Sequence, residues 1–476
     1  MKDFKYIWVL GIIATALLIA VPVLLLASNS TEKKDDPWDN VHTHVSSTDH
    51  SNLLEGPFET GSDVTRACLE CHEDSSQQVM QTTHWTWQAD EIDVEWSEEP
   101  VSTGKANVIN NFCIGVQSNW PSCTSCHAGY GWEDENFDFT EGDNVDCLAC
   151  HAQIGYVKGT AGNPVEGVDL LVAAQSVALP TRENCGSCHF NGGGGDAVKH
   201  GDLDQTLFYP DDHVDFHMGQ LDFQCVDCHV AEDHLIDGRS MSVSVDNANQ
   251  VYCTDCHATD LHEDDRINSH VDNIACQTCH IPTGAVREAT KMSWDWSDAG
   301  NDDVEESIHE YLKIKGTFVY EDNFMPEYAW YNGVVEYRYL LGDVIDPNEV
   351  TIFNPPSGDI DDSNSKIWPF KIHRGEQPYD TVNNYFLQPQ TVGEEGYWTT
   401  FDWDSALELG SEIVGMDYSG EYGFAPTEMY WNLSHMVQPA HHALQCNDCH
   451  GDNGRMDWEA LGYYGDPIRW GGRNND

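Results

Sequence analysis

Basic side chains are scarce in this 476-residue sequence. Its 22 lysines and arginines stand against 81 aspartates and glutamates, which leaves a formal net charge of −59 at pH 7. Proteins that bind nucleic acid neutralise phosphates with lysine and arginine, so this balance excludes nucleic acid as a partner. Acidic runs such as Glu133–Glu135 and Asp359–Asp362 are typical of solvated surface rather than of binding sites.

Cysteine is almost absent outside one repeated motif, Cys-x-x-Cys-His. Eight copies of it contain 16 of the 17 cysteines, and Cys113 is the remaining one. The cysteine pairs are Cys68 and Cys71, Cys123 and Cys126, Cys147 and Cys150, Cys185 and Cys188, Cys225 and Cys228, Cys253 and Cys256, Cys276 and Cys279, and Cys446 and Cys449. A histidine follows each pair directly: His72, His127, His151, His189, His229, His257, His280 and His450.

This spacing predicts covalently bound haem c. Two thiols three residues apart can each form a thioether with a vinyl group of one porphyrin, and the adjoining imidazole can bind the iron. Disulfides, a zinc ribbon or a redox Cys-x-x-Cys site do not require a histidine after the second cysteine in every copy. We therefore expect eight haem c groups, attached through sixteen cysteines and ligated by eight motif histidines.

A long apolar run occurs at the amino terminus, from Tyr6 to Ala27, after Lys2 and Lys5. Its 22 residues exceed the core of a usual signal peptide and can span a bilayer. We predict that residues 1–27 form a transmembrane signal anchor, with cleavage after Ala27 as the alternative, and that residues 28–48 form a polar tether. In either case the haem-bearing part is extracytoplasmic, either periplasmic or at the cell surface.

The rest of the chain divides by its motifs into three regions. Residues 49–290 contain seven motifs, residues 291–430 contain none, and residues 431–476 contain the eighth. At this density the porphyrins form the core, so we expect short helices joined by irregular loops. The predicted fold class is mainly α with much irregular structure, organised around eight haems. A small β content is expected in the haem-free region, which would cover the haem array.

The haem-free region contains the clearest local patterns. Alternating apolar residues predict strands over residues 316–320 and 334–340. The apolar spacing over residues 402–414 predicts a helix that ends at Gly415.

Histidines outside the motifs are candidates for the second axial ligand that a low-spin haem usually takes. Eight of them lie near motifs or in ordered context: His50, His84, His200, His217, His234, His262, His270 and His435. Weaker candidates lie in the tether or crowd the last motif: His42, His44, His441 and His442. Three more have no assigned role, although the last is also a candidate for a pocket: His213, His309 and His373.

Several segments of this chain resemble the octahaem tetrathionate reductases. These segments extend over nearly everything after His50: Thr83–Trp87, Asn107–Cys113, Cys123–Trp132, Gly192–Asp204, Ile274–Pro282, Lys371–Gly375 and Leu433–Pro439. The resemblance implies a periplasmic, mostly helical multihaem fold related to hydroxylamine oxidoreductase and the multihaem nitrite reductases. It also implies one catalytic haem among seven bis-histidine relays.

Two functions of different classes follow. The first is a reductase that delivers electrons to a small anion, either splitting tetrathionate into two thiosulfates or reducing nitrite or hydroxylamine to ammonia. The second is a non-catalytic electron conduit in which every iron has two protein ligands. Oxidation in the manner of hydroxylamine oxidoreductase is a third possibility and would require a tyrosine cross-link to a haem. A membrane quinol dehydrogenase or another cytochrome is the expected electron donor.

The resemblance places catalysis at the second haem, with His127 as its proximal ligand. The family has a cysteine equivalent to Cys113 beside its catalytic haem, where a thiol can contact a sulfur substrate. It also supplies a distal lysine from an Asp-x-x-Lys segment, but here Asp169 is followed by Val172 at the lysine position. The distal face is therefore open or capped by another group, of which Lys158 is the nearest amine, and Asp169 would relay protons. Basic side chains that could offset the acidic field for an anion are Lys105, Lys158, Arg182 and Lys199.

The motif count leads to a stoichiometric prediction. Pyridine haemochrome analysis of the mature protein should give eight haems per chain, and denaturation should release none because each is held by two thioethers. A value of six or fewer would contradict the assignment of the motifs.

Overall fold

The computed structural model describes residues 36–112, 115–192 and 194–473, together with residues 9, 12, 15 and 18. Most of the predicted anchor over residues 1–27 and the single cysteine Cys113 therefore lie outside the described residues. Within the described part, no helix is both long and apolar enough to cross a membrane. The chain divides into two compact units, one formed by Met1–Val41 with Tyr252–Ser269 and the other by His42–Val251 with His270–Asp476.

Short helices and irregular loops dominate the structure, as the motif density predicts. The α-helices are α2 (Gly61–Leu69), α3 (Ser75–Val79), α4 (Thr83–Thr86), α5 (Cys147–His151), α6 (Leu170–Gln175), α7 (Arg182–His189), α8 (Cys225–Cys228), α9 (Asp265–His270), α10 (Cys276–His280), α11 (Tyr397–Thr400), α12 (Trp403–Val414), α13 (Cys446–Cys449) and α14 (Pro467–Trp470). Shorter turns of helix are η1 (Pro37–Asn40), η2 (Gln117–Asn119), η3 (Cys123–Cys126), η4 (Gly142–Asn144), η5 (Thr160–Gly162), η6 (Gln205–Phe208), η7 (Phe216–Gln220), η8 (Cys253–Asp255) and η9 (Ala440–His442). The first cysteine of every motif lies in one of these helical turns, which confirms the predicted fold class.

The β structure is concentrated in the haem-free region, where it forms an eight-stranded sheet. Its strands are β3 (Thr290–Asp295), β4 (Tyr311–Leu312), β5 (Gly316–Glu321), β6 (Glu327–Tyr331), β7 (Thr351–Ile352), β8 (Lys366–Asp380), β9 (Tyr385–Phe386) and β10 (Tyr422–Asn432). The order is β4-β5-β3-β8-β10-β7, and β6 and β9 also pair with β8. A separate two-stranded ribbon joins β1 (Ala231–Glu232) and β2 (Leu235–Ile236).

Strand β8 is the centre of this sheet and was not visible as a strand in the sequence. It pairs antiparallel with β10, where Lys371 lies opposite Trp431, and parallel with β3, where Arg374 lies opposite Ser293. Most of its side chains are buried on both faces, so the alternation of apolar and polar residues that reveals a half-exposed strand is missing. The sheet is for this reason larger than the predicted β content.

Two of the three predicted elements of the haem-free region are confirmed. Strand β5 covers residues 316–321, and α12 covers residues 403–414 with Asp402 as its N-cap. Gly415 ends the helix in the left-handed conformation with φ 72°, as glycine commonly does after a helix.

The strand predicted over residues 334–340 is wrong. This segment is irregular and makes a single bridge, from Val335 to Pro356. Arg338 is fully buried within it, and its guanidinium donates to the carbonyls of Ser242, Phe353 and Ile109. Burial lowers the pKa of Arg338 to about 9. These hydrogen bonds to distant residues bend the chain around the guanidinium. They cannot be predicted from the local sequence pattern.

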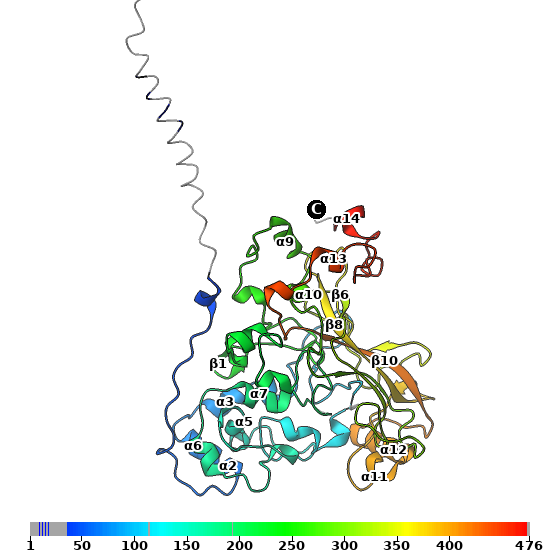
Figure 1. The fold of residues 1–476 in the computed structure, drawn as a ribbon. Coiled ribbons are helices and arrows are strands. Elements are labelled where there is room, and N and C mark those ends of the chain that lie inside the picture. Colours follow the sequence, from blue (N-terminus) through cyan, green and yellow to red (C-terminus); the bar gives the residue numbers. More distant parts are fainter. Residues whose placement is uncertain are drawn as a thin grey trace, which may run out of the picture. The chain divides into compact units, whose positions relative to one another are not determined.

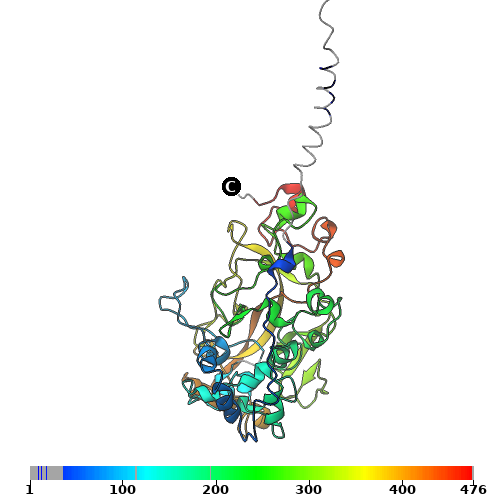
Figure 2. The same ribbon diagram turned by 90° about the vertical axis from the view of Figure 1, so that its left-hand side faces the viewer.

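Within the larger unit, the views in Figures 1 and 2 separate two groups of elements. Helices α13 and α14, which follow and include the last motif, lie at one end, whereas α2 and α6 lie at the other. Helices α11 and α12 pack near β10, and aromatic residues such as Trp403 and Trp431 form the core between them.

Helix α12 leads to a stability prediction at Gly410. Alanine in a helix interior usually gains about 1 kcal/mol over glycine. At Gly410, however, a Cβ would lie 1.8 Å from the carbonyl oxygen of Gln388, which is backbone and cannot move aside. We expect Gly410→Ala to lower the free energy of unfolding by about 2 kcal/mol in chemical denaturation. The exposed Glu412→Ala is the control, and a stabilised Gly410→Ala variant would show that α12 does not pack on residues 388–390.

Candidate haem-binding and active site

Five of the eight candidate distal histidines face a motif histidine at nearly the same distance. The ring centroids of these pairs are 6.1 to 6.4 Å apart: His50 with His72, His84 with His189, His151 with His234, His229 with His435, and His270 with His450. A metal–imidazole bond of about 2 Å on each side of one iron, plus the radius of each ring, requires roughly this spacing. The geometry therefore fits an iron between each pair.

The Nδ1 atoms of these histidines also fit haem ligation. His151 and His229 contact the carbonyls of Ala178 and Asp237 through Nδ1, at 2.8 and 2.7 Å. His234 uses Nδ1 toward the side chain of Gln78 at 2.8 Å. With Nδ1 so engaged, Nε2 is directed to the iron, which is the usual arrangement of metal-bound histidine.

The other three distal candidates have different surroundings. His200 is half-buried with its ring 4.8 Å from Trp431, and desolvation lowers its pKa to about 4. His217 lies in η7 and contacts the rings of Phe216 and Phe223. His262 belongs to the smaller unit, where its Nδ1 lies 3.1 Å from the side-chain oxygen of Asn268.

Three histidines outside the eight stronger ligand candidates have identifiable ring contacts. His213 and His442 form a sixth pair at 6.0 Å that contains no motif histidine. His309 contacts Tyr320 at 4.9 Å.

Thiols of different motifs come together in the larger unit. Three pairs of thiols are close enough to shift one another's pKa: Cys68 with Cys147, Cys126 with Cys188, and Cys185 with Cys225. Helices α5 and α7, which contain the third and fourth motifs, also pack together. The first, third, fourth and fifth motifs therefore form a continuous series, and the second joins it at the fourth.

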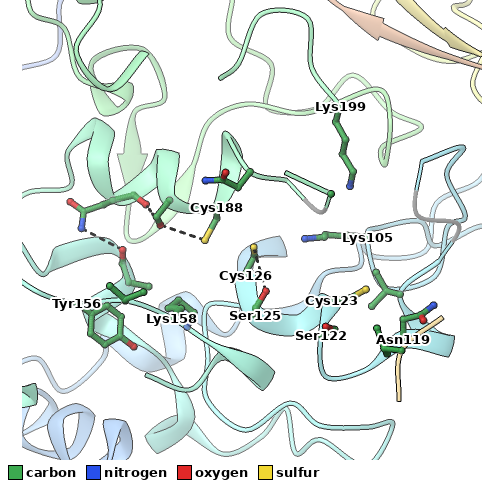
Figure 3. Close-up of a pocket in the computed structure, with 18 of the residues that line it drawn as sticks. Lys105, Asn119, Ser122, Cys123, Ser125, Cys126, Tyr156, Lys158, Cys188 and Lys199 are labelled. Atoms are coloured by element: carbon green, nitrogen blue, oxygen red, sulfur yellow. Dashed lines mark hydrogen bonds between the residues drawn. The ribbon is translucent and has the colours of Figure 1, made fainter. Parts of the chain in front are cut away.

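A cavity of about 670 Å³ lies where the second and fourth motifs meet. Cys123, Cys126 and Cys188 line it, so porphyrins attached at these thiols belong in this space. Four lysines also line it: Lys105, Lys158, Lys199 and Lys315. Figure 3 shows Lys105 extending toward Cys126, and Lys199 pointing toward Lys105. Glu183 is the single acidic side chain among the described lining residues, which makes the cavity cationic in a strongly acidic protein.

Lys158 is held at the cavity wall by a buried carboxylate. Its amine forms an ion pair with Asp146 and donates to the carbonyl of Gly162 at 2.9 Å. The hydroxyls of Tyr130 and Tyr156 donate to the same carboxylate at 2.8 and 2.7 Å. Asp146 directly precedes the third motif and caps α5, so the network is fixed by the backbone of that motif.

His127 of the second motif lies in an aromatic enclosure rather than against another histidine. Its described ring contacts are with Trp85, Trp87, Trp132, Phe137 and Phe139, at 4.7 to 6.2 Å. Its Nε2 lies 2.6 Å from the carbonyl of Trp85, while Nδ1 is buried without a partner. Burial lowers its pKa to about 4. The thiols of this motif fit haem attachment, but His127 as placed does not offer Nε2 to an iron.

Two residues predicted for the active site lie elsewhere. Asp169 is exposed and caps α6 by accepting from the amides of Leu171 and Val172, so it is not part of the cavity. Its capping role explains the aspartate, and Asp146 is the carboxylate that reaches Lys158. Arg182 is also absent from the cavity lining, because its guanidinium donates to the carbonyls of Met218 and Phe223 and pairs with Asp222.

Strand β8 fixes the segments next to the cavity through two buried side chains. Lys371 donates to the carbonyls of Val198 and Lys199 at 2.9 and 2.8 Å. His373 stacks on Phe112 at 3.6 Å and binds Asn111 through Nδ1 at 3.0 Å. Burial lowers the pKa of both groups well below their ordinary values. Lys371 and His373 are polar residues within an apolar segment of the sequence, which is the pattern that could have indicated their structural role. The sequence analysis named only His373 as a candidate. No sequence pattern indicates that Lys315 lines the cavity.

The geometry defines a multihaem c-type cytochrome with a cavity beside its second motif. Comparison with known proteins agrees. The crystal structure of octahaem cytochrome c from Shewanella oneidensis matches with a TM-score of 0.84 and 48% sequence identity, over 89% of this chain and 98% of that one. A family model described as "Cytochrome c bacterial" matches residues 291–453. An uncharacterised protein of Archaeoglobus fulgidus is 25% identical over 274 residues, which is 46% of this chain and 90% of that protein.

The chain belongs to the octahaem cytochromes c of the octahaem tetrathionate reductase family. It is accordingly an extracytoplasmic electron-transfer protein of the oxidoreductase type.

Removal of one facing histidine should expose one iron. In His234→Ala the third motif retains His151 but loses the opposite imidazole, so one haem should change from low spin to high spin. Electron paramagnetic resonance of the oxidised protein measures the change. His309→Ala, in the haem-free region, is the control, and an unchanged low-spin count in His234→Ala would exclude His234 as a ligand.

Proposed function

We propose that the protein reduces a small inorganic anion in the lysine-lined cavity. The observation that supports this most strongly is the charge of the cavity wall, where Lys105, Lys199 and Lys315 stand against Glu183, while Lys158 is paired with Asp146. Positive charges around one cavity repel one another, and a bound anion would offset that repulsion.

Five histidine pairs in this proposal hold the irons of the first, third, fourth, fifth and eighth motifs. His200, His217 and His262 remain candidates for the others. Eight haem c groups, one for each motif, would supply one-electron transfer between their irons.

The second motif is the catalytic one in this proposal. In this proposal the substrate would bind at the second haem beside Lys158, which Asp146 fixes at the cavity wall. The hydroxyls of Tyr130 and Tyr156 hold the same carboxylate in place. Cys113, which precedes this motif by ten residues, is proposed to contact a sulfur substrate.

Tetrathionate is the first candidate substrate, because the family resemblance points to it. Two electrons would cleave its central S–S bond and release two thiosulfates, with no proton consumed. Nitrite and hydroxylamine are the alternatives, and their reduction to ammonia consumes protons. A membrane quinol dehydrogenase or another cytochrome is the proposed electron donor, and residues 1–27 are the proposed membrane anchor.

The cavity lysines provide the central test. Lys199→Gln and Lys315→Gln each remove one positive charge from the wall, so each should raise KM for tetrathionate or nitrite about tenfold, equivalent to about 1.4 kcal/mol. KM for hydroxylamine, which is mostly uncharged at neutral pH, should change little. Lys313→Gln is the matched control, because Lys313 pairs with Asp302 and is not among the lining residues. Steady-state assays of the holoprotein give these values.

The same preparations distinguish catalysis from conduction. Cyanide or nitrite should bind one haem, and Cys113→Ser should lower turnover without loss of haem. Eight haems that all resist exchange, together with no turnover of any of the three substrates, would establish the conduit instead.

A further inference from the structure

Asp202 ties His435 in place with a single carboxylate oxygen. Its Oδ2 accepts from the backbone amides of Ser434 and His435 at 2.6 and 2.9 Å, and lies 3.2 Å from Nδ1 of His435. The ring of His435 also lies next to that of His229 of the fifth motif, with the centroids 6.1 Å apart and the ring planes within 25°. A carboxylate, an imidazole and the proposed iron position are therefore in series.

This carboxylate is buried and well supplied with hydrogen-bond donors. The side chain of Asp202 is 2% exposed. Two backbone amides and one imidazole surround its Oδ2, which is the environment that a buried carboxylate needs. The structure thus holds an acidic side chain directly beside one imidazole, away from water.

The other described histidine pairs differ in what lies behind the ring. Both members of the third-motif pair, His151 and His234, bind neutral oxygens through Nδ1. His450 of the eighth motif does bind a carboxylate, Asp466, at 2.7 Å, but that side chain is 12% exposed and close to solvent. The fifth motif alone among these three combines a carboxylate with full burial.

We propose that Asp202 sets the reduction potential of the fifth haem and makes it lower than that of the third. A carboxylate bonded to Nδ1 increases the electron density on Nε2, which stabilises ferric iron more than ferrous iron. In a dry site the negative charge acts in the same direction with little screening. Asp202 acts through His435, so it is a positioning residue and touches no substrate. The inference rests on the ligation proposed above for His229 and His435.

The position of the fifth motif in the series explains what a low reduction potential at its haem would do. Cys225 of the fifth motif meets Cys185 of the fourth, and Cys188 of the fourth meets Cys126 at the cavity. An electron leaving the fifth haem oxidises that iron and reduces the fourth, and a low potential at the fifth favours this direction. Asp202 would therefore drive electrons toward the second haem rather than away from it.

Asp202→Asn tests the proposal, because asparagine keeps the shape and removes the charge. We expect the ratio of ferric to ferrous iron at one haem to fall about tenfold at a fixed potential. This change corresponds to a rise of 59 mV in the reduction potential of that haem for one electron. Spectroelectrochemical titration of the holoprotein measures this, with haem content and low-spin signals unchanged. The control is Asp204→Asn, a carboxylate in the same loop that is also buried but caps η6 and does not contact a haem histidine.

Two further measurements separate the possible failures. His435→Ala should create one high-spin haem, and if it does not, the proposed ligation is wrong. If it does, but Asp202→Asn leaves every potential unchanged, the role of Asp202 alone is wrong. Should Asp202→Asn fail to mature, near-infrared magnetic circular dichroism of the native protein remains decisive. One haem besides that of the eighth motif, where Asp466 binds His450, should then show the band of a strongly polarised imidazole, and the absence of this second band would overturn the proposal.

Discussion

The structure depends on pairs of imidazoles held about 6 Å apart, the spacing that an iron between them would require. One imidazole comes from the attachment motif, and its partner comes from a distant part of the chain, as with His84 and His189 or His229 and His435. Each such pair is a long-range connection. This requirement explains why short helices and irregular loops suffice, because the cross-links rather than extended helices define the path of the chain.

Electrostatics separates an acidic exterior from a cavity lined by lysines. The exterior can carry many carboxylates because water screens them. The cavity lysines need support, and the fold provides it by different means at different positions. Asp146 pairs with Lys158, while strand β8 fixes the backbone beside Lys199 through the buried amine of Lys371. The haem-free region is thus a scaffold that shapes the cavity as well as a cover.

The order of the motifs in space differs from their order in the sequence. The second motif joins the series through the fourth, so the cavity lies on a branch rather than at an end. Such a branch lets electrons arrive from the fifth motif or from the first and third. The charge of Asp202 next to His435 would favour the route through the fifth motif. Lys199 at the cavity and Asp202 at the fifth motif belong to the same loop, so this loop contributes to both sites.

Sequence alone established what depends on residues three or four positions apart. The cysteine spacing identified haem c as the cofactor and predicts its number and attachment, and the cap residues Asp402 and Gly415 determined α12, because thioether geometry and helix capping are local. Tertiary structure decided the rest. It placed Asp169 on the surface and Asp146 at Lys158, brought Lys315 to the cavity, and turned residues 334–340 around Arg338. It also chose which histidines face each other. These outcomes depend on contacts between segments tens to hundreds of residues apart, and no short pattern encodes such contacts.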